Sequence, residues 1–479
     1  MRTTVDPGAE VWEVLRGEQV LRGESAREWA SGSGRERGAA GARGDAVAPV
    51  WQFGAPPDAV LFPESAEEVQ AVVRAAIRGG VSLLPAGTGA WLSAGGWGRE
   101  ARAIVSTARI GGVVHYEPAD LTLTAGAGLG VRALGELADR NGQWLPVDAP
   151  GSVGGTLGAA VACGVSGPLQ GCYGGVRDNV LGLEVVTGDG RILHIGGRVV
   201  KNVAGYDMVR LFTGSRGSLG VITRVSVRLF PRPGADVTLC FRGGAAEVVG
   251  MAREVCTAAF PVAAAEIVGG GGVGADRPAR GERGEGDAGM ADGGGASDGG
   301  GTIDDGGTTD DGGMTLAVRL LGSAEEVAEA GVRAVASLDR KPDEVLAGDD
   351  SAAFHEGRTR WEDGSPVVAR LAALPDRLGD VMGCAGRVSA VVRGEVAADA
   401  MRGLVRVKGS CAAGREEAVA DCLVRARAEM EDWGGSLALS SAPREVVEAV
   451  GWVGAGAGGV GGRIKALFDP HSILASGCP

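Results

Sequence analysis

The stretch Gly151-Ser-Val-Gly-Gly-Thr-Leu-Gly158 runs directly into the small-residue segment Ala159-Ala-Val-Ala-Cys163. Glycines let a main chain approach a ligand closely, and the start of a helix attracts anions. Two other segments have the same character, Lys201-Asn-Val-Ala-Gly-Tyr-Asp207 and Gly214-Ser-Arg-Gly-Ser-Leu-Gly-Val-Ile222. Pro85-Ala-Gly-Thr-Gly-Ala90 follows a strand end and offers backbone N–H groups to a phosphate, with an ordinary turn as the alternative. Together these segments predict a slot for a phosphate-bearing cofactor, although tight helix packing is an alternative reason for the small residues after Gly158.

Two common nucleotide-binding motifs are excluded, one by a missing residue and one by spacing. The glycine segments lack the lysine that a Walker motif needs to hold a triphosphate. In Leu121-Thr-Leu-Thr-Ala-Gly-Ala-Gly-Leu-Gly130 the third glycine comes one residue too early for the dinucleotide fingerprint. We interpret this second segment as a structural turn between a strand and a helix.

Composition restricts the class of protein. A chain of 479 residues exceeds one ordinary hydrophobic core, and its net charge of −13 argues against a nucleic-acid partner. Eight cysteines without a C-x-x-C pair and four histidines without metal-ligand spacing predict no metal site and a reduced, cytoplasmic protein. No apolar run reaches eighteen residues, so we expect no direct membrane span and any membrane association to come through partner subunits.

The chain divides into three predicted regions. Residues 1–50 are charged and glycine-rich and predict a flexible lead-in, residues 51–233 a first domain, and residues 234–479 a second α+β domain. Within the second domain, residues 269–313 hold ten acidic residues and three arginines among Gly, Ala and Thr, so this insert is predicted to be disordered. Strand-like sequences on both sides favour a loop between two strands of one domain over a domain boundary.

Local signals set individual elements. Ser65, with Glu68 three residues later, predicts a capped helix that ends at Gly79-Gly80. Gly188-Asp-Gly190 separates two alternating apolar segments, a strong hairpin signal. In the segment Lys201-Asn-Val-Ala-Gly-Tyr-Asp207, Lys201 is a candidate cation beside a cofactor, and the alternative is a surface lysine followed by an aspartate that caps a helix.

Residues 55–233 resemble the FAD-binding domain of the vanillyl-alcohol oxidase type, which has the PCMH fold. The resemblance rests on motifs that fall in the family's order and spacing: Pro63-Glu-Ser-Ala-Glu-Glu-Val69, Pro85-Ala-Gly-Thr-Gly89, Gly151-Ser-Val-Gly-Gly155, Ser166-Gly-Pro168, Tyr173-Gly174 and Gly217-Ser-Leu-Gly-Val-Ile222. Within that family, Gly197-Arg-Val-Val-Lys-Asn-Val-Ala-Gly-Tyr-Asp207 looks like the signature of the FAD-binding E subunit of glycolate oxidase. It implies an α+β fold, with a two-subdomain PCMH-type FAD-binding domain followed by an α/β cap domain.

The resemblance also implies which residues bind FAD. They are Ala86, Gly87, Thr88, Gly89 and Ala90 at the pyrophosphate, and Gly151, Ser152, Val153, Gly154, Gly155, Ser166, Gly167, Gly220 and Val221 elsewhere on the cofactor, with Lys201 as the candidate cation. Because the first loop has no histidine, non-covalent FAD is expected, and Cys163 and Cys172 alone leave a covalent link open. The catalytic residues stay unassigned.

The implied activity is that of an FAD-binding subunit in a complex that oxidises glycolate, or a similar 2-hydroxy acid, to glyoxylate. Its implied partners are a D-type flavin subunit and an iron–sulfur subunit that passes electrons onward. The chain lacks the H-x-G-D-G-N-x-H motif of the D subunit. Two alternatives therefore stay open, a stand-alone dehydrogenase of the D-lactate type and a non-catalytic flavin-holding subunit, while a stand-alone sugar or alditol oxidase is weaker.

Overall fold

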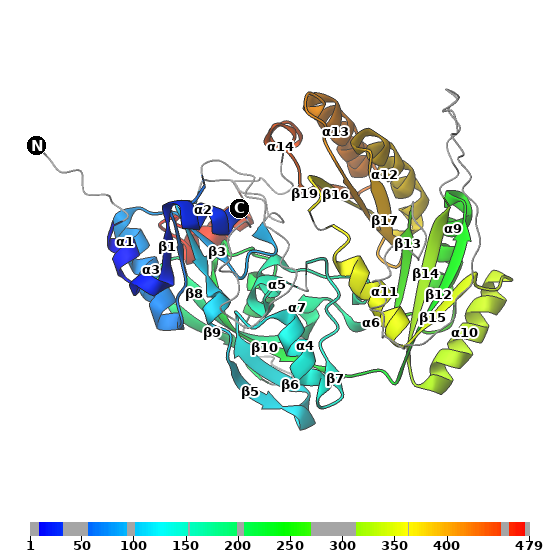
Figure 1. The fold of residues 1–479 in the computed structure, drawn as a ribbon, viewed down its shortest axis with the longest axis horizontal. Coiled ribbons are helices and arrows are strands. Elements are labelled where there is room, and N and C mark those ends of the chain that lie inside the picture. Colours follow the sequence, from blue (N-terminus) through cyan, green and yellow to red (C-terminus); the bar gives the residue numbers. More distant parts are fainter. Residues whose placement is uncertain are drawn as a thin grey trace, which may run out of the picture.

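The computed structural model describes residues 9–31, 56–92, 101–151, 154–198, 206–269, 313–362, 364–451 and 459–474. We call the described residues 9–231 the N-terminal part and 235–451 the C-terminal part. The two parts lie side by side, each with its own sheets and helices (Figure 1). The α+β class predicted from the sequence is confirmed.

The N-terminal part contains two main sheets. The first has the order β1 (Val20–Arg22), β2 (Ala59–Leu61), β4 (Ala103–Ser106), β3 (Leu83–Ala86), with β2, β4 and β3 parallel. The second is antiparallel, in the order β5 (Val113–Glu117), β6 (Thr122–Gly126), β10 (Gly220–Arg228), β8 (Val180–Thr187), β9 (Ile192–Gly196). A two-stranded ribbon joins β7 (Gln143–Trp144) to β11 (Phe230–Pro231).

The local signals lie where the sequence predicts them. Helix α3 (Ala66–Gly79) begins after Ser65, whose side chain accepts the Glu68 N–H, and it ends at Gly80 in the left-handed region. The Glu68 carboxylate accepts from Glu64 N–H rather than from Ser65, so one half of the predicted capping box is present. Strands β8 and β9 form the predicted hairpin around Gly190, where φ is 79°.

The described portion of the lead-in predicted for residues 1–50 has regular secondary structure and docks on the first sheet. Residues 9–31 form α1 (Ala9–Glu13), β1 and α2 (Gly23–Ser31), and β1 pairs antiparallel with β2. The reason is that apolar residues in this otherwise charged segment join two core clusters, Val11 and Trp12 one of them and Trp29 the other. Residues 1–8 and 32–50 lie outside the described ranges.

The C-terminal part is built on one antiparallel sheet. Its order is β15 (Glu344–Ala347), β12 (Ala235–Gly243), β14 (Met314–Gly322), β13 (Ala264–Val268), β17 (Glu395–Asp399), β18 (Leu404–Gly409), β16 (Val367–Ala372), β19 (Ser436–Ser441). β13 and β14, on either side of the predicted insert, pair with each other, as expected for a loop within one sheet. Residues 270–312 of that insert lie outside the described ranges.

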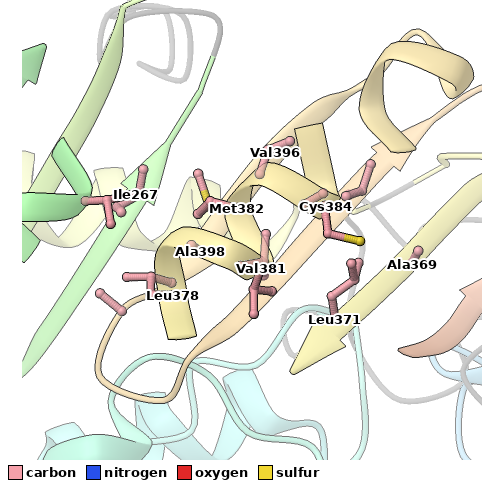
Figure 2. Packing of buried hydrophobic residues seen from close by; sticks show 14 of the residues in the cluster. Ile267, Ala369, Leu371, Leu378, Val381, Met382, Cys384, Val396 and Ala398 are labelled. Atoms are coloured by element: carbon pink, nitrogen blue, oxygen red, sulfur yellow. The ribbon is translucent and has the colours of Figure 1, made fainter. Parts of the chain in front are cut away.

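The two faces of this sheet differ in chemistry. The outer face is apolar and covered by α9 (Ala245–Thr257), α10 (Ala324–Leu338), α12 (Leu378–Val392) and α13 (Glu416–Asp432) (Figure 1). Figure 2 shows Val381 and Met382 of α12 packed over Leu371, Val396 and Ala398 of the strands. Helix α11 (Asp349–Thr359) lies on the opposite face, which is turned toward the N-terminal part.

The chain's last elements divide between the parts. Helix α14 (Arg444–Val450) packs against α13, but α15 (Val460–Phe468) returns to the N-terminal part, where Phe468 contacts Phe212 at 5.2 Å between ring centroids. Leu474 then bridges to Leu83 beside β3. The range 234–479 predicted for the second domain therefore ends with residues that pack on the first.

Candidate cofactor-binding site

A pocket lies where β3 ends, beside α5 (Leu157–Cys163) and the start of β10. It contains about 630 Å³ of empty space, part of it open to solvent. Its lining residues are small or apolar apart from Thr107, Cys163 and one cation, Arg216, and they are Pro85, Ala86, Gly87, Gly89, Ala90, Trp91, Leu92, Thr107, Gly158, Ala159, Ala162, Cys163, Arg216, Gly217, Gly220, Val221 and Ile222. Bare main chain with a single guanidinium is the kind of wall that accepts a phosphate group.

Close approach of the backbone explains the glycines. A Cβ at Gly87 would lie 2.1 Å from Thr156 Oγ1, and one at Gly158 would lie 2.4 Å from the Ala127 side chain. At Gly217, where φ is 78°, a Cβ would lie 2.9 Å from Pro85. No larger residue fits at these positions without moving a neighbour. Packing within the protein therefore requires glycine here, in addition to any requirement set by a ligand.

Six of the residues predicted to bind FAD line this pocket. They are Ala86, Gly87, Gly89, Ala90, Gly220 and Val221. Thr88 does not line it, but its hydroxyl donates to the Gly154 carbonyl at 2.6 Å and so joins the first loop to the second.

The second loop lies against the pocket's tryptophan. A Cβ at Gly155 would lie 2.2 Å from the Trp91 ring, and one at Gly151 would lie 2.8 Å from it. Trp91 Nε1 donates to the Pro150 carbonyl at 2.7 Å, which fixes the indole beside this loop.

The remaining predicted residues lie elsewhere. Ser166 and Gly167 do not line the pocket; Gly167 packs against Asp148, whose Oδ1 would lie 2.2 Å from an added Cβ. Ser152, Val153 and Lys201 fall outside the described residues. Asp207 caps α8 (Met208–Phe212) by accepting the Arg210 N–H, as the alternative interpretation of that segment predicts.

Sequence reasoning missed several lining residues. Trp91 carries no local signal, because a tryptophan after a glycine loop is equally expected in a core. Arg216 stands inside a quoted glycine segment and is the sole cation among the lining residues, a signal that could have identified it. It has φ of 54° and donates its N–H to Ala162 at 2.6 Å, so a strained turn holds it beside α5.

The segment around Gly126 has the structural role predicted for it. Added Cβ atoms at Gly126 and Gly128 would lie 2.1 Å and 2.2 Å from the carbonyl oxygens of Ile110 and Thr107. These glycines therefore permit contact between β6 and the preceding turn, and α4 (Val131–Asp139) follows directly.

The C-terminal part touches the loops around the pocket directly. Gly151 N–H donates to the carbonyl of Thr359, the last residue of α11, at 2.9 Å. Arg402 Nη1 reaches the Gly167 carbonyl at 3.5 Å and lies 3.6 Å from Asp399 Oδ2. The two glycine loops are thus held between both parts of the chain.

The sheet face behind these contacts is charged. Direct pairing places Thr238 beside Arg319, Glu266 beside Asp399, and Arg406 beside Arg370, all on the face opposite the apolar core. We call these six residues the charged face. All but Arg370 are buried, and the Arg370 side chain is 32% exposed. Arg370 and Arg406 both donate to Glu362, at 2.9 and 3.3 Å.

Burial shifts the pKa of two carboxyl groups here. Burial raises the pKa of Asp399 to about 7, with Arg402 opposing the shift and Glu266 adding to it. Burial also raises the pKa of Asp148, on the N-terminal side, to about 6, against the hydrogen bond from Leu169 N–H. Carboxyl groups that titrate near neutrality in a closed region are characteristic of functional sites, and also of structural ion-pair networks.

Comparison with known proteins identifies the cofactor of the N-terminal part. Residues 57–196 match the family described as FAD binding domain. Glycolate oxidase subunit GlcE of Escherichia coli (strain K12) is 44% identical over 129 residues, which cover 27% of this chain and 37% of that protein. A probable mitochondrial D-lactate dehydrogenase of Danio rerio is 35% identical over 217 residues, 44% of this chain and 43% of that protein.

A third relative is glycolate oxidase subunit GlcD of Bacillus subtilis (strain 168), 33% identical over 189 residues, 39% of this chain and 40% of that protein. The chain thus matches about two fifths of the length of these curated relatives. A solved alkyldihydroxyacetonephosphate synthase shares the fold at a TM-score of 0.66 and 14% identity, covering 98% of this chain and 84% of that one. The predicted FAD-binding resemblance is confirmed, and FAD is the cofactor of this domain.

Proposed function

We propose, from the premise that residues 57–196 form an FAD-binding domain, that this chain is the FAD-binding subunit of an oxidoreductase complex that oxidises glycolate or a similar 2-hydroxy acid. The observation that carries the proposal is the glycine pocket, whose neighbouring loops contact Thr359 and Arg402 of the C-terminal part through Gly151 and Gly167. The relatives are named as glycolate oxidase subunits and D-lactate dehydrogenases, which act on 2-hydroxy acids.

The chain's own residues fit the cofactor. Ala86, Gly87 and Gly89 would present backbone to the FAD pyrophosphate, and Arg216 would supply its counter-charge. FAD, when bound, accepts a hydride from an alcohol carbon. We propose residues 51–233 as the FAD-binding domain and 234–479 as the cap, except for α15 and Leu474, which pack on the FAD-binding domain.

We propose that FAD is held without a covalent bond. Burial raises the pKa of the Cys163 thiol to about 11, and so keeps it protonated and a poor nucleophile. Among the described residues that line the pocket, none is a histidine. Acid precipitation should release all of the yellow chromophore into the supernatant, and colour that stays with the pellet would contradict this attachment.

The proposed partners are a D-type flavin subunit and an iron–sulfur subunit, in the cytoplasm. The names GlcE and GlcD describe subunits of one oxidase, which supports a multi-subunit assembly. In the described residues, no helix combines the length and hydropathy needed to cross a bilayer. Co-expression of tagged chain with a D-type subunit should recover both proteins together, and recovery of the tagged chain alone would count against the assembly.

The decisive experiment uses the purified chain. Its visible spectrum tests for FAD, and anaerobic addition of glycolate or D-lactate tests for turnover. We expect bleaching of the flavin only when the D-type subunit is present. Bleaching by the chain alone would favour the second candidate, a stand-alone dehydrogenase, for which the charged face beside the cofactor loops is the supporting observation. A colourless protein that FAD does not reconstitute would refute both.

A further inference from the structure

Five side chains of the C-terminal part form an unbroken series of polar contacts. Ser351 Oγ donates to Asp236 Oδ1 at 2.6 Å and lies 2.7 Å from Thr238 Oγ1. Thr238 Oγ1 lies 2.9 Å from His355 Nε2, and His355 Nδ1 lies 3.1 Å from Glu266 Oε1. We call these five residues the polar network.

Three elements hold the polar network in place. Asp236 and Thr238 alternate along β12, Ser351 and His355 are one turn apart on α11, and Glu266 is on β13. Thr238 and Ser351 are completely buried, and Glu266 and His355 are 1% and 4% exposed. With so little access to water, each contact must be satisfied inside the network.

The ends of the network are ionised carboxylates. Burial pushes the pKa of Asp236 upward, but the two hydrogen bonds and the charge of Arg319 outweigh it and lower that pKa. Burial likewise opposes ionisation of Glu266, yet the hydrogen bond from His355 and the charges of Arg358 and Arg406 lower its pKa. Both ends therefore accept hydrogen bonds and donate none.

Four contacts then need four hydrogens. Ser351 and Thr238 each supply one, and a neutral His355 supplies one more. Burial, followed by the charge of Arg319, lowers the pKa of His355, against the attraction of Glu266 and Asp236, so the resting imidazole is neutral. In that state three hydrogens are available for four contacts. One contact therefore has no hydrogen between its two heavy atoms, and their lone pairs repel each other.

The network opens on a cavity between the two parts of the chain. His355 and Arg319 line it from the C-terminal part, and Asp148 and Trp144 line it from the N-terminal part, around about 960 Å³ of space that is partly open to solvent. Thr359, whose carbonyl binds the Gly151 loop, lines the same cavity. The network therefore adjoins the FAD loops on the side where the two parts meet.

We propose that the polar network is a proton acceptor, one hydrogen short at rest, that takes up the proton released when a 2-hydroxy acid is oxidised between the two parts of the chain. This inference rests on the proposed function for the source of the proton. Oxidation of the alcohol to the 2-oxo acid breaks its C–H bond, with hydride leaving to FAD, and its O–H bond, with the proton leaving to the network.

The added proton completes every contact. His355 then donates from Nδ1 to Glu266 and from Nε2 to Thr238 Oγ1. The Thr238 hydroxyl turns to donate to Ser351, and the Ser351 hydroxyl continues to donate to Asp236. The positive charge on the imidazole is balanced by Glu266, with which Arg358 and Arg406 also interact. His355 acts here as a positioning and proton-holding residue rather than one that touches substrate.

Two substitutions remove the shortage in different ways. In Ser351→Ala, two contacts remain, Thr238 with His355 and His355 with Glu266, and the two available hydrogens satisfy both. In Thr238→Val, the Ser351 and His355 hydrogens likewise satisfy the two contacts left. Ser351→Thr keeps the hydroxyl and is the matched control. In Ser351→Ala and in Thr238→Val, an extra proton on His355 completes no missing hydrogen bond.

The test is an NMR titration of flavin-free protein labelled with ¹⁵N-histidine, in which His355→Asn assigns one of only four histidines. We expect His355 to accept its second proton in the wild type and in Ser351→Thr about one pH unit or more above the value in Ser351→Ala and Thr238→Val, because a completed hydrogen bond favours the charged form. Equal titration in the wild type and both hydroxyl-free variants would overturn the inference.

A second arm separates the inference from the proposed function. Anaerobic reduction of the FAD-loaded complex by glycolate should shift the His355 signals to those of imidazolium in the wild type and not in Ser351→Ala. If glycolate reduces the flavin while His355 stays neutral, the network is not the acceptor. If glycolate does not reduce the flavin, the proposed substrate is wrong, and the titration of flavin-free protein still decides whether the network is one hydrogen short.

Discussion

Asp399 lies at the end of β17, 2% exposed, and neither of its carboxylate oxygens has a hydrogen-bond partner among the described residues. Its pKa of about 7 exceeds its ordinary value of 3.8, because burial penalises the charge more than Arg402 compensates. The folded state therefore binds a proton that the unfolded state releases between pH 4 and 7. Stability from this group is complete below about pH 4 and is lost as the pH rises to 7.

Asp399→Asn should consequently stabilise the protein in a pH-dependent way. We expect its gain in unfolding free energy over the wild type to grow from pH 4 to pH 7 and then level off, with a ceiling of about 4 kcal/mol. Urea unfolding at pH 4, 5.5 and 8 measures the gain. Asp421→Asn, at an exposed position on α13, is the control and should show no such trend. A gain that is flat with pH would show that Asp399 is ionised throughout.

Gly155 is the residue at which the cofactor loop meets Trp91 most closely. A Cβ there would lie 2.2 Å from Cη2 and 2.3 Å from Cζ3 of the indole, which is itself buried. Gly155→Ala should displace the loop or Trp91 and weaken FAD binding at least about tenfold, equivalent to about 1.4 kcal/mol. Flavin content after gel filtration and a fluorescence titration of the flavin-free protein measure this loss.

Gly135→Ala is the matched control for Gly155→Ala. Gly135 lies within α4, and an added Cβ there meets no atom within 4 Å. Alanine should leave FAD affinity unchanged and stabilise the helix by up to about 1 kcal/mol. Unaltered FAD binding in Gly155→Ala would mean that Trp91 moves aside without cost.

At the scale of single elements, the sequence predicts α3 well and α11 not at all. α3 combines a serine cap, regular apolar spacing and a terminal glycine, and these local signals are sufficient. The buried positions of α11 mix Phe354 with Ser351, His355 and Arg358, so no apolar stripe marks the helix. Its buried side packs on a polar sheet face. The residues of that face are distant in sequence, so they cannot be identified from the helix segment alone.

The last helix, α15, is anchored to the N-terminal part by the Lys465–Asp469 ion pair, which we call the clasp. Lys465 Nζ lies 2.8 Å from Asp469 Oδ2 and donates to the carbonyls of Ser218, at 3.0 Å, and Leu474, at 3.2 Å. Asp469, whose side chain is fully buried, also accepts the N–H groups of Ile473 and Leu474. The ion pair therefore joins α15 to the start of β10 and to the strand bridge at Leu83.

Lys465→Met should destabilise the protein by about 3–5 kcal/mol, because it leaves the Asp469 charge buried without its cation. Thermal and urea unfolding measure the loss. Lys465→Met combined with Asp469→Asn should cost less than the sum of the single substitutions, the signature of a coupled pair. Arg132→Met removes an exposed ion pair with Glu136 and should change stability by less than about 0.5 kcal/mol. Additive single effects at 465 and 469 would rule out the clasp.

At the scale of the whole molecule, the sequence could predict the glycine pocket but not the charged face. Glycines that permit close backbone contact are contiguous in sequence, so their pattern can be identified directly. The charged face takes single residues from six strands, including Arg319, Glu266 and Asp399. Along any one strand such a residue alternates with apolar ones and resembles an ordinary solvated position. Contacts distant in sequence bury such residues, as Ser351 and His355 of α11 do for Thr238 and Glu266.

Arg402 joins the two parts through its side chain. Its guanidinium lies between Asp399 of the C-terminal part and the Gly167 carbonyl of the N-terminal part. A ligand that binds only the folded state stabilises all segments that unfold together with its binding site. In the wild type, FAD should therefore protect both parts of the chain from hydrogen exchange. In Arg402→Met, we expect FAD to protect β10 as before but to protect β17 and β18 about tenfold less.

Hydrogen exchange followed by mass spectrometry, with and without saturating FAD, measures the two parts separately. Arg425→Met is the control, since Arg425 is exposed on α13, which covers the apolar face of the sheet. It should retain the wild-type protection in all three strands. Equal FAD protection of β17 and β18 in wild type and Arg402→Met would show that the coupling passes through the Gly151–Thr359 hydrogen bond instead, which makes the end of α11 the next position to alter.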